Sequence, residues 1–196
     1  LEKIAYRIFS ASDKNATAIP DFSTHESTHN GKPVILVGYG RMGHRIGYIL
    51  ELMKVDYLAI ESDINIVNRE RAEGKSVYFG DAQRPEVLRA AGITDAPFVI
   101  VSINDFEVTE RVVSSLSSIF PNIPVFVRGH DLTKCRELKA LGAKFTVSET
   151  LEASAELAHA ALLYIGAEDA EISVALEEFR EDYYGRINKG YDDKIE

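Results

Sequence analysis

The sequence has little of what several classes of protein require. Cys135 is the single cysteine among 196 residues, so no disulfide can form within the chain and a reducing compartment is favoured. No stretch approaches the roughly 20 consecutive apolar residues of a membrane-spanning helix. No signal-peptide pattern is present either. These absences exclude a small disulfide-stabilised scaffold and favour a globular domain.

Basic residues are also in the minority. The chain has 22 Lys and Arg against 31 Asp and Glu, a formal net charge of −9. No basic stripe stands out along the sequence, which argues against nucleic acid as a partner. Hydrophobic residues make up 45% of the chain and mean hydropathy is −0.10, so there is enough apolar material for a core. The length allows one domain of ordinary size with appendages.

A glycine-rich motif follows the first strongly apolar run, at residues 34–37. Gly38 permits a tight turn, Gly40 lets the backbone approach a phosphate, and Gly43 lets a helix pack closely on a strand. The first-turn N–H groups of the helix expected over 44–53 would face the anion. A second strand ends at Glu61, 18 residues after Gly43, close to where a ribose-binding acid is expected. This combination predicts a nucleotide-binding βαβ unit.

Strand and helix patterns then alternate as far as residue 165. Short apolar runs predict six strands, at 34–37, 57–61, 77–79, 98–101, 125–127 and 145–147. Helical patterns separate them, beginning near Pro85 and covering about 108–119, 131–141 and 151–165. The runs do not alternate strictly, which is typical of strands buried on both faces. We therefore predict an α/β fold with a Rossmann-like, doubly wound parallel sheet of six strands and helices on both faces.

Three segments are expected. Residues 32–165 form the nucleotide-binding domain. Residues 1–31 comprise a short amphipathic helix end and a polar linker, and the first residue, Leu1 rather than Met, suggests a piece of a longer protein. Residues 166–196 form an acidic, amphipathic helical tail, whose apolar stripe of Ile172, Leu176 and Phe179 needs a partner. That partner is either the domain itself or a second subunit; we favour a dimer contact.

Polar residues gather at the expected strand ends, where open α/β sheets bind ligands. Asp81 either accepts from an adenine amino group or begins the next helix, and Asn104 or Asp105 either caps a helix or contacts ligand. Asp131 is expected to be a helix N-cap. Arg128 ends a buried strand, where a guanidinium must meet an anion or carbonyl groups, so a ligand contact is favoured.

The remaining histidines and the cysteine carry weaker expectations. His25 and His29 are four residues apart, a spacing that suits a metal on a helix, but the segment is not helical in pattern and lacks a third ligand. His44 either contacts ligand or is a solvated or capping residue. His159 is expected in the core or at an interface, and Cys135 is expected to be structural.

Several motifs together resemble the RCK N-terminal (KTN, or TrkA-N) domain, most closely the C-terminal domain of Kef and plastid KEA potassium/proton antiporters. The resemblance covers about residues 32–165. The residues that carry it are Gly38-Tyr39-Gly40-Arg41-Met42-Gly43, Val77-Tyr78-Phe79-Gly80-Asp81-Ala82, Phe120-Pro121-Asn122, Val127-Arg128-Gly129-His130-Asp131, Leu141-Gly142-Ala143 and Ser148-Glu149-Thr150.

This resemblance implies regulation rather than catalysis. Domains of this family bind AMP, ADP, ATP or NAD(H) and bias an attached transporter, so the implied partners are a second copy and a covalently attached transmembrane antiporter domain. The implied location is the cytosolic, or stromal, face of a membrane. A second arginine is common where this chain has His130, which argues against glutathione as an effector. The expected site consists of Gly38, Tyr39, Gly40, Arg41, Met42, Gly43, Glu61, Ser62, Gly80, Asp81, Ala82, Ser102, Asn104 and Arg128.

Two alternatives stay open at the level of sequence. A NAD-dependent oxidoreductase fragment would share the glycine motif, and Glu61 would favour NAD over NADP. Such an enzyme needs a substrate site with an acid/base group, yet only about thirty residues follow the last helix of the domain and no Ser-Tyr-Lys or His-Asp arrangement is evident. A free-standing regulatory subunit of Trk-type potassium uptake is the second alternative. We therefore expect a binding module and no enzyme.

Overall fold

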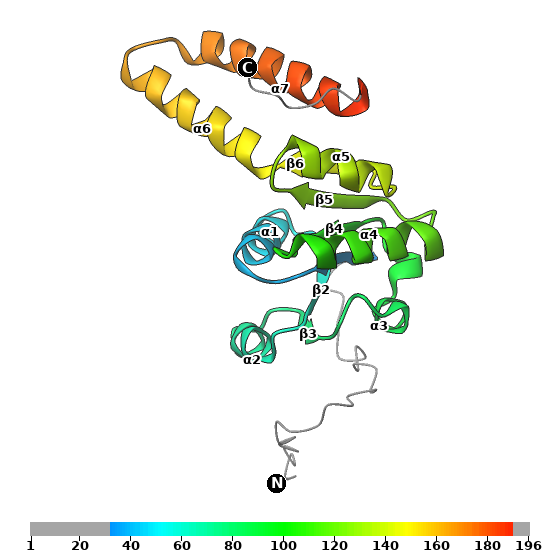
Figure 1. Ribbon diagram of the computed structural model, residues 1–196. Coiled ribbons are helices and arrows are strands. Elements are labelled where there is room, and N and C mark those ends of the chain that lie inside the picture. Colours follow the sequence, from blue (N-terminus) through cyan, green and yellow to red (C-terminus); the bar gives the residue numbers. More distant parts are fainter. Residues whose placement is uncertain (1–31, 190–196) are drawn as a thin grey trace.

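The computed structural model describes residues 32–189. Its core is one sheet of six parallel strands in the order β3-β2-β1-β4-β5-β6 (Figure 1). All six expected strands are present, so the predicted doubly wound topology is confirmed. The expected features within residues 1–31, including the pair His25 and His29, lie outside the described residues. The strands are β1 (Val34–Val37), β2 (Tyr57–Glu61), β3 (Val77–Phe79), β4 (Val99–Val101), β5 (Val125–Gly129) and β6 (Phe145–Ser148).

Helices connect the strands, and their ends follow local sequence rules. Pro85 opens its helix at the first position, and Gly142 follows the end of another with φ +104°, as expected. The carboxylates of Asp105 and Asp131 accept from the backbone N–H groups of Val108 and Lys134, so both residues are N-caps. The helices are α1 (Arg41–Leu52), α2 (Ile64–Ala72), α3 (Pro85–Ala90), α4 (Phe106–Ile119), α5 (Leu132–Ala140), α6 (Glu149–Tyr164) and α7 (Asp169–Lys189), with a 3₁₀ turn at Ile93–Asp95.

The two faces of β1 and β2 are both buried. On one face, Ile35 and Leu58 pack in the largest cluster, with side chains of α3 and α4. On the other, Leu36 and Ala59 pack with residues that belong to α1 and α2. The predicted covering of both sheet faces by helices is confirmed around β1 and β2. Because both faces of these strands are buried, their sequences are continuous apolar runs.

The strands β4, β5 and β6 differ because one of their faces is only partly buried. Their burial alternates along each strand, whereas every residue of β1 and β2 is buried. Phe98, just before β4, lies 5.1 Å from Phe126 in β5, and Phe126 lies 5.8 Å from Phe145 in β6, measured between ring centroids. Phe145 is 51% exposed. We call these three phenylalanines the open face.

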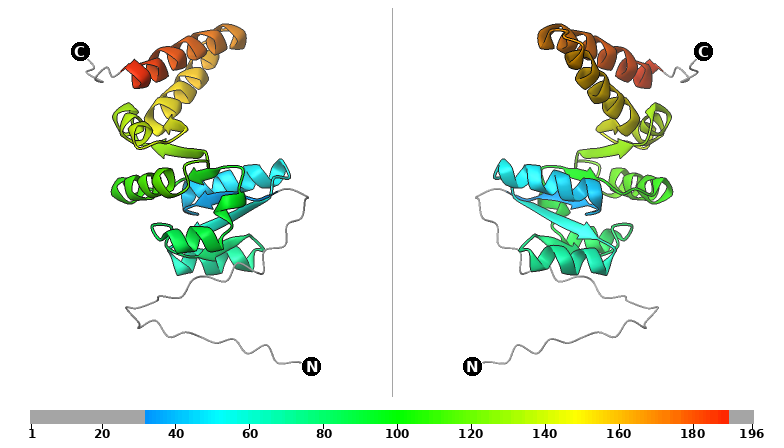
Figure 2. Two further views of the ribbon diagram at one scale, coloured as in Figure 1. Left: turned by 90° about the vertical axis from the view of Figure 1, so that its right-hand side faces the viewer. Right: turned by 90° about the vertical axis from the view of Figure 1, so that its left-hand side faces the viewer.

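The helices α6 and α7 form a hairpin that extends from the β6 edge of the sheet (Figures 1 and 2). Gly166, with φ +88°, lies in the turn that reverses the chain. Phe179 of α7 packs on Leu132 and Cys135 of α5, and Ile172 is buried. Ile172 is therefore covered within the chain, whereas Leu176 and Phe179 are only partly buried, and the expected contact of this stripe with a second subunit stays a prediction. In the described part of the chain, no helix is both long and apolar enough to cross a membrane.

Candidate functional site

The glycine loop between β1 and α1 has the geometry that each glycine was predicted to allow. Gly38 adopts φ +88°, a conformation that side chains disfavour. A Cβ atom on Gly43 would lie 2.2 Å from the carbonyl oxygen of Gly38, so helix and loop approach as closely as backbone permits. A Cβ atom on Gly40 would meet nothing within 4 Å. The space beside Gly40 is open to a ligand, and Gly40 is the N-cap residue of α1.

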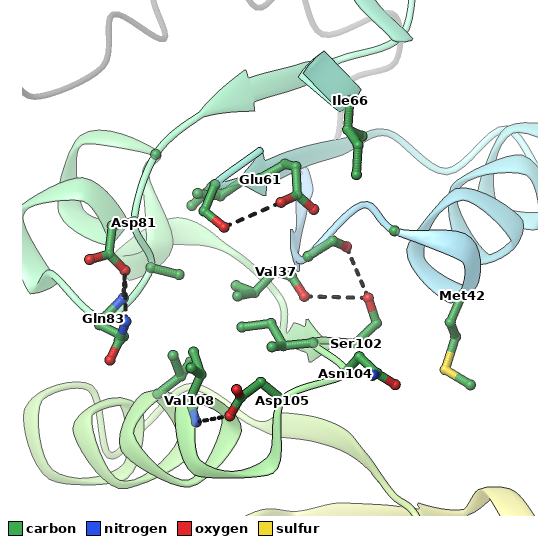
Figure 3. Close-up of a pocket in the computed structure, with 18 of the residues that line it drawn as sticks. Val37, Met42, Glu61, Ile66, Asp81, Gln83, Ser102, Asn104, Asp105 and Val108 are labelled. Atoms are coloured by element: carbon green, nitrogen blue, oxygen red, sulfur yellow. Dashed lines mark hydrogen bonds between the residues drawn. The ribbon is translucent and has the colours of Figure 1, made fainter. Parts of the chain in front are cut away.

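Hydrogen bonds fix this loop to neighbouring strands. The Gly38 N–H donates to the Ile60 carbonyl oxygen at 2.8 Å, and the Ser102 hydroxyl donates to the Gly38 carbonyl oxygen at 2.9 Å. Ser102 also lies 3.4 Å from the Val37 carbonyl oxygen, as Figure 3 shows. The loop is therefore held in place from both β2 and β4, so its N–H groups keep a fixed direction.

Glu61 ends β2 beside the glycine loop and is 9% exposed. Its Oε2 accepts from the Tyr39 N–H at 2.6 Å and its Oε1 accepts from the Asp63 N–H at 2.9 Å. Oε1 also accepts from the Ser62 hydroxyl at 3.4 Å, whereas Oε2 retains a further acceptor position. Glu61 is thus oriented toward the cavity by backbone groups, in a position suited to accept from a ligand hydroxyl group.

A cavity of about 960 Å³ lies at the carboxyl ends of the strands, and Figure 3 shows Glu61, Asp81, Ser102 and Asn104 around it. All of the expected site residues line it except Tyr39 and Gly43. Gly43 acts by packing instead. The lining that sequence analysis assigned comprises Gly38, Gly40, Arg41, Met42, Glu61, Ser62, Gly80, Asp81, Ala82, Ser102, Asn104 and Arg128.

Tyr39 is a correction to the expected site, as far as its side chain is concerned. The ring is 1% exposed and turns away from the cavity. Its hydroxyl oxygen lies 2.6 Å from that of Tyr57, and a Cβ on Gly47 would meet it at 2.6 Å. Burial raises the pKa of Tyr39 above its ordinary value. The side chain fills the space between α1 and β2, and only the N–H of Tyr39 serves the site, through Glu61.

Arg128 lines the cavity, but residues of this chain already bind its guanidinium group. Its Nη1 forms an ion pair with Glu149, the first residue of α6. Its Nη2 donates to the Asn104 side-chain oxygen at 2.6 Å and to the Ile103 carbonyl oxygen at 3.3 Å. The sequence predicted that the Arg128 guanidinium must meet an anion or carbonyl groups. Glu149 and the Ile103 carbonyl oxygen of the same chain provide them. Asn104 is fixed by the same contact, whereas Asp105 caps α4.

Other polar residues near the strand ends have structural roles. Asp81 lines the cavity, and its carboxylate accepts from the Gln83 N–H at 2.9 Å, which fixes the turn before α3. His44 does not line the cavity; its Nδ1 lies 3.0 Å from Oε2 of Glu70 in α2. Cys135 is buried, and burial raises the pKa of its thiol to about 11. His159 contacts Asp169 across the α6–α7 turn.

Sequence analysis missed several lining residues, notably Arg45, Phe79, Arg84 and Glu149. Arg45 lies one helical turn after Arg41, so helical periodicity was an available signal for it. Phe79 is the last residue of β3 and is 45% exposed, directly before the expected Gly80. Glu149 belongs to the motif Ser148-Glu149-Thr150 of the family resemblance, but its place in the cavity depends on the pairing of β6 with β5.

Metal chemistry has no support in the described residues, since 32–189 contain no group of three or more His, Cys, Asp or Glu suited to a metal ion. The lining also contains no His, Cys, Lys or Tyr side chain among the residues described. What the arrangement offers is a phosphate-sized space at a helix N-terminus, an oriented carboxylate and several arginines. These features define the class of Rossmann-fold nucleotide-binding domains.

Comparison with known proteins places the chain within that class. The TrkA-N domain family matches residues 34–149, and the chain belongs to this family. It is 31% identical over 156 residues to a glutathione-regulated potassium-efflux system protein of Haemophilus influenzae, a match that covers 80% of this chain. The matched segment spans 25% of that relative's length.

Solved structures share the fold. The Shewanella denitrificans Kef C-terminal domain in AMP-bound form has a TM-score of 0.68 at 23% identity, over 81% of this chain and 96% of that one. GsuK bound to ADP has a TM-score of 0.54 at 26% identity, over 62% of this chain and 31% of that one. A GsuK channel bound to NAD has a TM-score of 0.55 at 21% identity, over 80% and 25%.

Proposed function

We propose that this chain is a nucleotide-binding regulatory domain of a potassium/proton antiporter. The single observation that carries the proposal is the cavity at the carboxyl ends of the strands, where the open space beside Gly40 meets the oriented carboxylate of Glu61. A nucleotide would place a phosphate at the N-terminus of α1, where backbone N–H groups can bind it. It would place a ribose at Glu61, whose carboxylate can accept from a ribose hydroxyl. The family membership and the named potassium-efflux relative support the assignment to potassium transport.

The proposed ligand is an adenine nucleotide (AMP, ADP or ATP) or NAD(H). The adenosine ribose would donate a hydroxyl proton to Glu61, which lines the cavity and has a free acceptor position on Oε2. A 2′-phosphate in that position would be repelled by the carboxylate, so NADP(H) should bind poorly. The ADP complex of the 26% identical GsuK supports an adenine nucleotide.

Regulation would operate through a shift in population. A nucleotide that binds one arrangement of the domain more tightly biases the attached transport domain by its difference in affinity. In this proposal a transmembrane antiporter domain is covalently linked to the chain, which works at the cytosolic face of the membrane or its stromal equivalent.

Two copies are proposed to pair, using the open face. Further apolar side chains are exposed at the end of α1, where Ile49 and the C-cap residue Met53 are 57% and 71% exposed. The hairpin presents Leu157 and Ile165, 73% and 76% exposed, on α6 and in the turn after it. One chain thus has an apolar surface on its sheet and another on the α6–α7 hairpin. A two-fold pair would cover both surfaces of each copy with the other's.

The test of the proposed ligand is calorimetry with NADH, ADP and NADPH on the purified chain. We expect NADH and ADP to bind, and NADPH to bind more weakly than NADH. Glu61→Ala should weaken NADH binding by about 1.5–3 kcal/mol, the value of hydrogen bonds to a charged group. Asp105→Ala is the matched control, because Asp105 lines the same cavity but its carboxylate caps α4. NADPH affinity equal to or above that of NADH would refute the assigned role of Glu61.

A further inference from the structure

The turn that follows β3 places two polar side chains in the cavity wall. Asp81 and Gln83 both line the cavity. In Figure 3 they lie on the side opposite Met42 of α1, with Glu61 in between. Oδ1 of Asp81 accepts from the Gln83 backbone N–H at 2.9 Å and from its side-chain Nε2 at 3.3 Å, whereas Oδ2 forms no hydrogen bond within residues 32–189. Asp81 therefore keeps an acceptor position for a ligand.

Arg111 of α4 determines which way the Gln83 amide group points. The Arg111 Nε donates to the Gln83 side-chain oxygen at 2.7 Å. Because a guanidinium group has only donors, the atom that faces it must be the amide oxygen, and the amide nitrogen faces Asp81 instead. That nitrogen carries two hydrogens, and Asp81 accepts one of them. The turn thus offers a ligand an acceptor on Asp81 beside a donor on Gln83.

The cavity wall around this pair is apolar. Phe79 pairs with Glu61 across β3 and β2, so the place proposed for the ribose adjoins the end of β3. The apolar residues that line the cavity here, on α2, α3, α4 and the turn after β3, are Ile66, Ala82, Val87, Val108 and Val112. Beyond β4 the lining carries the ion pair of Arg128 and Glu149 instead. A planar base suits apolar walls with few polar groups, so the end near β3 is the place for it.

We propose that Gln83 is a specificity-determining residue that selects a purine with a 6-amino group, and that Arg111 is its positioning residue. The proposal rests on the nucleotide-binding function. At its Watson–Crick edge, adenine has an amino donor beside the N1 acceptor, which complements Asp81 and Gln83. Hypoxanthine has a carbonyl oxygen beside an N1–H group, so acceptor meets acceptor at Asp81 and donor meets donor at Gln83. The orientation of one amide group therefore contributes to the choice of base.

The test is calorimetry on the purified chain with ADP and with inosine diphosphate (IDP), which carries hypoxanthine on the same ribose and phosphates. We expect wild-type protein to bind ADP at least about tenfold more tightly than IDP. Gln83→Leu lacks the donor, so ADP should bind about fivefold more weakly. IDP should bind as tightly as before or more tightly, because its N1–H no longer meets an amide N–H group. The ratio of the two affinities should therefore fall by about fivefold or more.

A second variant tests the role of Arg111. In Arg111→Met the Gln83 amide group can rotate, so the ratio of ADP to IDP affinity should fall by about threefold. The lost positive charge does not affect this ratio, because both nucleotides carry the same phosphates. Arg89→Met is the matched control, since the Arg89 guanidinium lies over the Phe120 ring and Arg89 does not line the cavity. It should leave the ratio unchanged.

The outcomes separate this proposal from the nucleotide-binding function. An unchanged ratio in Gln83→Leu, including equal weakening of ADP and IDP, would place Gln83 away from the Watson–Crick edge and overturn the proposal. An unchanged ratio in Arg111→Met would overturn the positioning role. Equal affinity of wild-type protein for ADP and IDP would overturn the selection of a base but leave nucleotide binding intact. Failure of wild-type protein to bind either nucleotide would overturn both.

Discussion

The two halves of the sheet differ in how they are covered. Every residue of β1 and β2 is buried, with α1 and α2 on one face and α3 and α4 on the other, and this half holds the glycine loop and Glu61. In β4–β6 one face stays partly exposed and carries the open face. A ligand site needs backbone groups fixed in direction, whereas an interaction surface needs apolar area left uncovered. The first half meets the first requirement, whereas the second half leaves apolar area uncovered and also lines the cavity with Ser102, Asn104 and Arg128.

The largest effect should follow a substitution in the fully covered half. Gly43→Ala places a Cβ atom 2.2 Å from the Gly38 carbonyl oxygen, which is fixed by Ser102 and cannot move aside. We expect a loss of about 3 kcal/mol or more in the free energy of unfolding, typical of overpacking against backbone. Urea denaturation measures it. Gly40→Ala is the control, since its Cβ meets nothing within 4 Å. Equal stability of the two variants would contradict the close approach of α1 to the loop.

A smaller effect is expected where α7 packs on the second half. The Tyr184 hydroxyl donates to Glu152 at 2.8 Å and accepts from the Ser148 N–H at 3.2 Å. Tyr184→Phe should cost about 1–2 kcal/mol, because it leaves both partners without this bond. Tyr183→Phe, on the same helix, is the control. If Tyr184→Phe does not lower stability, α7 is not held on β6 and α6 as described.

The same hydroxyl predicts a dependence on pH. Burial, together with the nearby Glu152, raises the pKa of Tyr184 to about 12, although the Ser148 N–H opposes the shift. Because the pKa of Tyr184 is higher in the folded than in the unfolded state, its protonated hydroxyl contributes to stability. This contribution is complete below the ordinary tyrosine pKa of about 10. That contribution is lost as pH rises from about 10 through about 12. The stability difference between wild type and Tyr184→Phe should therefore shrink over this range.

The smallest effect on the stability of a single chain is expected at the open face. Phe145→Ser removes a half-exposed ring, so unfolding should become easier by about 1 kcal/mol or less. Self-association should weaken by about tenfold or more if a second copy covers this face. Light scattering over a concentration series measures it, with Val174→Ser on α7 as an exposed apolar control. Unchanged association in Phe145→Ser would place the pair contact elsewhere.

The sequence predicted best those features that depend on nearby residues. Gly38, Gly40, Gly43 and Glu61 fall within one βαβ unit, and their spacing alone defines the turn, the open space and the carboxylate. The six strands were recognised for a similar reason, because each is a short apolar run bounded by turn residues. The helix caps Asp105 and Asp131 depend only on the three residues that follow them.

Features that depend on distant residues were not predicted. Glu149 meets Arg128 because β6 lies beside β5, and residue spacing in the sequence does not encode that contact. Tyr39 lies within the glycine motif, but its direction depends on Tyr57 and Gly47, which leave space for the ring beneath α1. The apolar stripe on α7 correctly predicted a need for cover. It did not reveal that Phe179 packs against a cluster that includes Leu132 and Cys135 of α5 in the same chain.

The central claim, that the glycine loop binds a nucleotide phosphate, is tested most directly by calorimetry of ADP binding to Gly40→Val. We expect the free protein to accept the valine, because nothing lies within 4 Å of the Cβ position, while the side chain occupies the space assigned to phosphate. Gly185→Val on α7 is the control, with an equally open Cβ position. We predict that Gly40→Val keeps the wild-type melting temperature and binds ADP at least about a hundredfold more weakly, a loss of about 2.7 kcal/mol. Wild-type ADP affinity in Gly40→Val, with the fold intact, would contradict the claim.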